Sequence, residues 1–115
     1  MTAILFVAQR VTAIVLTFAV TVHLATILYA VRTGVTAGQI LERTRDNAWF
    51  LAFYLVFVGA IAIHAPIGLR NVMREWTRWR GWTLDVVLFL VAIGLMLLGL
   101  RAALAVYLPI AISIK

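Results

Sequence analysis

AWFLAFYLVFVGAIAIHAPIGL, residues 48–69, decides the fold, because it runs for 22 residues without a formal charge. An α-helix rises about 1.5 Å per residue, so a helix of this length matches the roughly 30 Å hydrocarbon core of a bilayer. Backbone polar groups in hydrocarbon have no water to bond, which leaves the helix as the form for such a segment. The stretch predicts a membrane-spanning helix, with a kink expected at Pro66.

Two more stretches, residues 11–31 and 84–107, have the same apolar character. The chain has 115 residues, of which 65% are hydrophobic and 12% are charged. Soluble domains are about a quarter charged, so this composition places the chain among membrane proteins. We predict one all-α integral membrane domain over residues 1–115, with three transmembrane helices at 11–31, 48–69 and 84–107. Asp85 is expected to cap the third helix.

The segments between the spans carry most of the charge. Residues 33–47 end in QILERTRDN, which favours a short helix at the membrane interface, and residues 70–83 carry four arginines and three tryptophans. Arginine and tryptophan at segment ends anchor helices among lipid headgroups, so the net charge of +6 does not indicate a nucleic-acid partner. The positive-inside rule places the second loop and the N-terminus in the cytoplasm.

Two of the predicted spans each contain one histidine, His23 and His64. A polar side chain in hydrocarbon is costly without a partner, so each histidine indicates a functional site, with a structural hydrogen bond as the alternative. Helix rise places His23 about 18 Å and His64 about 8 Å from the cytoplasmic boundary. Two axial ligands of one haem face each other at one depth. If both histidines bind haem, we therefore expect them to bind different irons.

Several residues after His64 share its helical face, namely Gly68, Asn71 and Glu75 at positions i+4, i+7 and i+11. Gly68 has no side chain, so a flat macrocycle could approach the backbone one turn from the imidazole. Arg70 and Asn71 lie further toward the cytoplasm. They are expected within reach of haem propionates, which need cationic or donor partners.

HAPIGLRNVMREW, which begins at His64, resembles the second-helix signature of the cytochrome b membrane-anchor subunits of succinate dehydrogenase and fumarate reductase (complex II). QRVTAIVLT, residues 9–17, is similar to the H-R-x-S/T-G opening of their first helix. The resemblance implies three helices that form half of a haem-binding anchor bundle. It also implies a second membrane-anchor subunit, an iron–sulfur subunit and a flavoprotein subunit as partners, in a prokaryotic cytoplasmic (inner) membrane.

The resemblance also implies roles for single residues. His64 would be an axial ligand to the iron of haem b. Arg10 matches the arginine that lies near the quinone and the haem propionates in the family, and Arg70 matches the arginine of the family's G-x-R motif. Glu75 and Trp76 match an aspartate–tyrosine pair that lies at the quinone in some members.

Four positions depart from the family pattern. Gln9 and Asn71 replace histidines, Trp76 replaces a tyrosine, and Phe6 stands where some members have a serine at the quinone. His23 matches the first-helix histidine that ligates the distal haem in di-haem members. The resemblance therefore implies one haem b or two, with quinone as the substrate. Met96 falls at a depth near that of His23; packing among the helices is its expected role, with ligation of a second iron as the alternative.

The chain carries no cysteine, which excludes disulfides, iron–sulfur ligation and thiol catalysis by this chain. It also lacks a nucleophile–base pair, a metal-hydrolase spacing and a phosphate loop, so we expect no catalysis by the chain alone. The expected function is electron transfer between the iron–sulfur subunit and membrane quinone. The alternatives are a haem-free anchor or accessory subunit, and a small transporter subunit that oligomerises around a polar Thr/His face.

Overall fold

The protein is described by a computed structural model that covers residues 2–108. Its helices in chain order are α1 (Ala3–Thr33), α2 (Ala37–Thr44), α3 (Ala48–Trp76) and α4 (Trp82–Tyr107), and no strand occurs within residues 2–108. Three of them, α1, α3 and α4, are long and apolar enough to cross a membrane. The predicted all-α membrane protein with three spans is confirmed.

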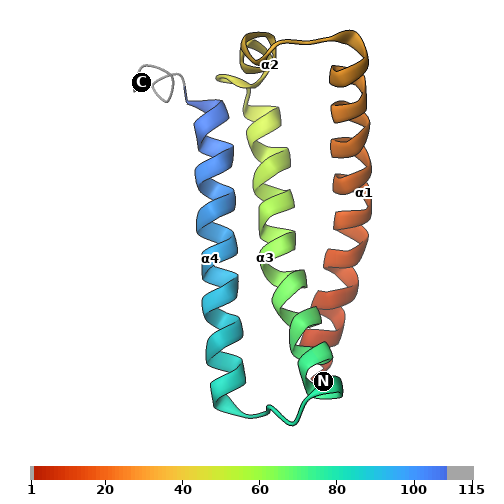
Figure 1. Ribbon diagram of the computed structural model, residues 1–115, viewed down its shortest axis with the longest axis vertical. Helices are drawn as coiled ribbons and strands as arrows, with labels where there is room; N and C mark the ends of the chain where they lie inside the picture. Colours follow the sequence, from red (N-terminus) through yellow and green to blue (C-terminus); the bar gives the residue numbers. More distant parts are fainter. Residues whose placement is uncertain (1, 109–115) are drawn as a thin grey trace.

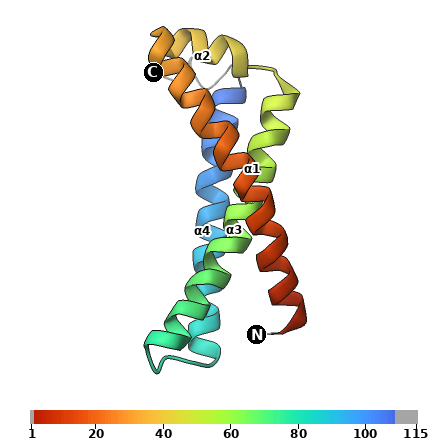
Figure 2. The same ribbon diagram turned by 90° about the vertical axis from the view of Figure 1, so that its right-hand side faces the viewer.

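The long helix α3 lies between α1 and α4 and packs against both, and both run antiparallel to it (Figure 1). Figure 2 shows α1 crossing α3 at an angle, with α2 lying across one end of the bundle. Large apolar side chains cover the outside of all three spans; Phe18 is 71% exposed and Leu98 is 67% exposed. This outer surface is suited to contact with lipid tails or with other helices.

Helix α1 begins at Ala3, eight residues before the expected start of the first span at residue 11. Thr2 caps it, because the Thr2 side chain accepts a hydrogen bond from the Leu5 backbone N–H. Residues 4–8 are apolar, and the helix continues through them to Gln9 and Arg10. Arg10 therefore lies inside the first helix, whereas the apolar run predicts it just before the span.

Helix α3 continues through Pro66 and ends at Trp76, so residues 70–76 are helical and the connection to α4 is confined to residues 77–81. The expected long loop over residues 70–83 is therefore wrong. Pro66, which is buried inside α3, lacks a backbone donor and frees the carbonyl of Ala62, and this favours a bend of the helix at that point. Figure 1 shows the axis of α3 changing direction in its second half.

Helix α4 follows Gly81, whose φ of 92° needs a residue without a side chain. Among the described residues no side chain caps α4, so the prediction that Asp85 caps this helix is wrong. The Asp85 carboxylate instead accepts a hydrogen bond from the Arg70 guanidinium of α3, with Nε and Oδ1 2.9 Å apart. An ion pair thus joins α3 to α4 near their connecting loop.

The short helix α2 overlaps the interfacial helix expected near residues 39–47. Thr36 and Gln39 form a reciprocal capping box at its start. At its end, the buried Thr44 hydroxyl donates to the Val106 carbonyl at 2.8 Å, and the Asp46 N–H donates to the Tyr107 carbonyl at 3.1 Å. The last turn of α4 would otherwise leave these carbonyls without partners, so α2 completes that end of the bundle.

Candidate functional site

His64 is half-buried on the side of α3 that faces α1. Its Nδ1 lies 3.2 Å from the hydroxyl oxygen of Thr12, which is only 7% exposed. The same oxygen lies 2.7 Å from the Ala8 carbonyl and 3.1 Å from the Gln9 carbonyl, both on α1. A polar contact therefore joins two apolar helices at the level of His64.

Gly68 lies one turn beyond His64, and the side chain of Gln9 covers it. A Cβ added to Gly68 would come within 3.2 Å of the Gln9 side-chain nitrogen. The Gln9 side-chain oxygen is buried and has no hydrogen-bond partner within residues 2–108. The space beside Gly68 that is expected to admit a macrocycle is thus held by the amide end of the flexible Gln9 side chain, which can move.

Arg70 and Asn71 lie on different faces of α3. Asn71 is seven residues after His64 and shares its face, whereas Arg70 is six residues after it and points about 120° away. Arg70 turns toward α4 and Asp85, and both side chains line an open groove of about 340 Å³ between the helices. The structure brings Asn71 to the His64 face and does not bring Arg70 there.

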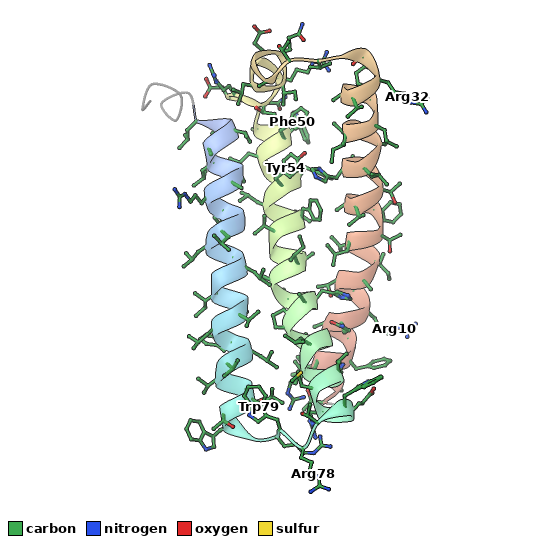
Figure 3. All side chains as sticks on the ribbon, viewed as in Figure 1. Arg10, Arg32, Phe50, Tyr54, Arg78 and Trp79 are labelled. Carbon is green, nitrogen blue, oxygen red and sulfur yellow. The ribbon has the colours of Figure 1, made fainter. Side chains whose placement is uncertain are left out.

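The residues expected at a quinone site do not meet in this chain. Arg10 is exposed, its guanidinium lies 5.5 Å from the Phe6 ring centre on the same helix, and it points away from α3 (Figure 3). Glu75 and Trp76 are exposed at the end of α3, Trp76 by 83%. Within residues 2–108 Arg10 forms no ion pair with Glu75.

His23 lies in aromatic surroundings at the other end of the α1–α3 interface. Its Nδ1 is 3.2 Å from the Tyr54 hydroxyl, and its ring meets those of Tyr54 and Phe57 edge-on, with centres 5.7 and 5.5 Å apart. A cavity of about 360 Å³ opens beside it, lined by residues of all four helices, among them Thr44 and Gly99. Met96 is not among the lining residues, so it is not placed as a partner of His23.

The two histidines lie at different levels of the bundle. Their partners on the opposite helix place them ten residues of α3 apart, since Tyr54 contacts His23 and His64 contacts Thr12. Ten residues correspond to about 15 Å along a helix. One haem iron therefore cannot take both imidazoles of the same chain as its axial ligands.

The sequence alone does not mark Thr12 or Tyr54 as site residues, because a threonine in a span is tolerated and a tyrosine near a span end is typical of the interface. In two antiparallel helices the paired residue numbers keep a nearly constant sum, and the two contacts satisfy this to within one residue. The rule needs one contact to be known and gives the other only to within one residue, so no signal in the sequence points to these two partners.

Comparison with protein-family models, with curated proteins and with solved structures finds no match to this chain. The chemical role of the site must therefore be argued from its residues and their geometry. Within residues 2–108 no three His, Asp or Glu side chains gather closely enough to hold a bare metal ion. What each histidine offers is a single imidazole, set in an apolar helix interface.

Proposed function

We propose that this chain is a haem b-binding membrane-anchor subunit of a succinate dehydrogenase or fumarate reductase complex. In this role it carries electrons between an iron–sulfur subunit and membrane quinone and helps to form the quinone site. The observation that carries the proposal is His64: one imidazole, half-buried at the α1–α3 interface of an apolar bundle, with Nδ1 bonded to Thr12. The resemblance of the segment that begins at His64 to the second-helix signature of such anchors supports the same function.

The residues around His64 fit one side of a haem. His64 supplies a nitrogen ligand, Gly68 leaves the helix backbone bare except for the Gln9 amide, and Asn71 offers a donor on the same face. Gln9 must swing aside, and its buried side-chain oxygen loses no hydrogen bond to any described residue when it does so. Arg70 is less suited to a propionate, because Asp85 already neutralises it.

When bound, haem b supplies reversible one-electron transfer. The chain's own part is to hold and orient the cofactor and to keep water away from it. A second axial ligand would come from a companion membrane-anchor subunit, because His23 lies about 15 Å from His64 along the bundle. The exposed apolar faces of α1, α3 and α4 are suited to such a companion and to lipid.

The end of the bundle that holds residues 77–81 would face the cytoplasm of a prokaryote and dock the iron–sulfur and flavoprotein subunits. Arginine and tryptophan gather there, with Trp76 and Trp82 at 83% and 75% exposure. Figure 3 shows Arg78 and Trp79 at this end, beyond the apolar length of the helices. The positive-inside rule then gives the N-terminus the same side of the membrane.

A haem-free anchor subunit is the second candidate, and one observation favours it. Both histidines already have a protein hydrogen-bond partner, and the space at Gly68 is filled by Gln9. In that case the imidazoles would serve only to join α1 to α3.

A reduced-minus-oxidised spectrum separates the two functions. The complex is purified with its companion subunits from cells that carry the wild-type chain or the His64→Ala variant. The b-type α-band should be present in the wild type and should be lost or strongly reduced in His64→Ala, while the subunits still co-purify. A band of unchanged height in an assembled His64→Ala complex would refute ligation by His64, and the absence of any band in the wild type would favour the haem-free anchor.

A further inference from the structure

We infer that Thr12 is a positioning residue for His64. The Thr12 hydroxyl oxygen accepts a hydrogen bond from the His64 Nδ1–H, which leaves the His64 Nε2 unprotonated and able to ligate iron. The inference rests on the proposed function of His64 as a haem ligand. It adds the reason why this imidazole presents a lone pair and not an N–H to its cofactor.

The argument starts from the single proton of the Thr12 hydroxyl. Its oxygen lies 2.7 Å from the Ala8 carbonyl and 3.1 Å from the Gln9 carbonyl. Carbonyl oxygens only accept hydrogen bonds, so the hydroxyl proton is donated to the α1 backbone. Toward His64, 3.2 Å away, the same oxygen can then only accept.

A neutral imidazole carries one N–H, and here Nδ1 must carry it. Nε2 is then the nitrogen with the free lone pair, which is the form that binds a metal. In the other tautomer the lone pairs of Nδ1 and of the hydroxyl oxygen would face each other. Thr12 is only 7% exposed, so water has little access to relieve that repulsion.

His23 lacks such a constraint. Its partner, the Tyr54 hydroxyl, makes no second hydrogen bond within residues 2–108, so it can either donate to Nδ1 or accept from it. Either tautomer of His23 can form this hydrogen bond, so the contact does not fix the position of the proton. The geometry therefore prepares His64 for ligation and leaves His23 unprepared.

A hydrogen bond from the far nitrogen makes a ligating imidazole a stronger electron donor, which favours the oxidised iron. Thr12→Val keeps the shape of the side chain and removes the acceptor. In the assembled complex we expect the haem midpoint potential to rise and haem retention to fall by about 10–100-fold, the usual effect of losing such a partner. Thr12→Ser restores the oxygen and should return both values toward those of the wild type.

Thr17→Val is the matched control. Thr17 also lies on α1 and also donates to a backbone carbonyl, that of Ala13 at 2.8 Å, but it is exposed and contacts neither histidine. Its replacement should leave the potential unchanged. If Thr12→Val does not assemble, Thr12→Ala removes the same oxygen without the apolar bulk and is read in the same way.

The outcomes separate this inference from the proposed function. If His64→Ala abolishes the α-band while the variants that lack the Thr12 hydroxyl keep both the wild-type potential and the wild-type haem content, Thr12 has no positioning role and the inference is overturned. If Thr12→Val shifts the midpoint potential and Thr12→Ser shows the same shift, the inference is also overturned, because the cause would then be packing and not the hydroxyl oxygen. If His64→Ala keeps the band, both ideas fail together, and this result is distinct from the first.

Discussion

The two histidine sites show how one residue type in one kind of apolar interface takes two different chemical settings. His64 meets the hydroxyl of a buried threonine whose proton is already used by the α1 backbone, and the amide of Gln9 lies one turn away. His23 meets a phenol that is free to rotate, two aromatic rings and a cavity of about 360 Å³. The bonding state of the partner, and not burial alone, decides what each imidazole can offer.

The largest difference is expected in haem content. His64→Ala removes the proposed ligand and should lower the haem bound per complex by at least about 10–100-fold, the cost of losing even an outer-shell partner of a metal. His23→Ala should leave the content unchanged, because His23 has no fixed lone pair. A pyridine haemochrome assay of the purified complex measures both. Loss of one of two haems in His23→Ala would restore the di-haem interpretation.

The next largest difference is expected in stability, when alanine replaces the glycine near each histidine, Gly68 near His64 and Gly99 near His23. A Cβ at Gly99 would lie 2.7 Å from a methyl carbon of Val58, a stiff β-branched side chain, whereas a Cβ at Gly68 would meet only the mobile end of Gln9. Gly99→Ala should destabilise the fold by about 1–3 kcal/mol through overpacking. In the haem-free protein, Gly68→Ala should be nearly neutral, because about 1 kcal/mol of gained helix propensity offsets the displacement of Gln9.

Thermal unfolding of the complex, purified in one detergent from cells that cannot make haem, measures both glycine variants. Val58→Ala, combined with Gly99→Ala, makes room for the new methyl group and should recover most of the lost stability. Equal destabilisation by Gly68→Ala and Gly99→Ala would show that the two helix contacts are equally tight, contrary to the geometry.

A smaller effect is expected at Tyr54. Tyr54→Phe removes the hydroxyl that contacts His23 and keeps the aromatic packing. Hydrogen bonds between membrane helices contribute about 0.6 kcal/mol on average, so the unfolding temperature should fall only slightly. The haem spectrum should not change. A marked spectral change in Tyr54→Phe would mean that the His23 end takes part in cofactor binding.

The smallest effect is expected at Asp85. The Arg70 and Asp85 side chains are 23% and 56% exposed, and ion pairs at such positions contribute about 0–1 kcal/mol. Asp85→Asn should therefore barely change stability at moderate salt. If Asp85 also holds Arg70 away from the haem, Asp85→Asn should shift the haem potential upward by freeing a cation. An unchanged potential would place Arg70 outside the haem environment.

Much of the architecture could be predicted from the sequence. The number of spans and the all-helical class follow from apolar runs long enough to cross hydrocarbon. The helix limits were less predictable, because the apolar run before Arg10 and the helical residues 70–76 extend the helices past the charges that bound the apolar runs. Charged residues can continue a helix at the headgroup level, so charge marks the membrane boundary and not the helix end.

What the sequence determined by itself is therefore local: spans of bilayer length, a histidine in two of them, and arginine and tryptophan at their ends. The tertiary structure alone decided that His64 faces Thr12, that His23 faces Tyr54, that Arg70 pairs with Asp85 and that Arg10 turns outward. The physical reason is that lipid-facing and helix-facing surfaces are equally apolar in a membrane. Hydropathy then carries no information on how the helices rotate, and only their packing brings particular polar groups together.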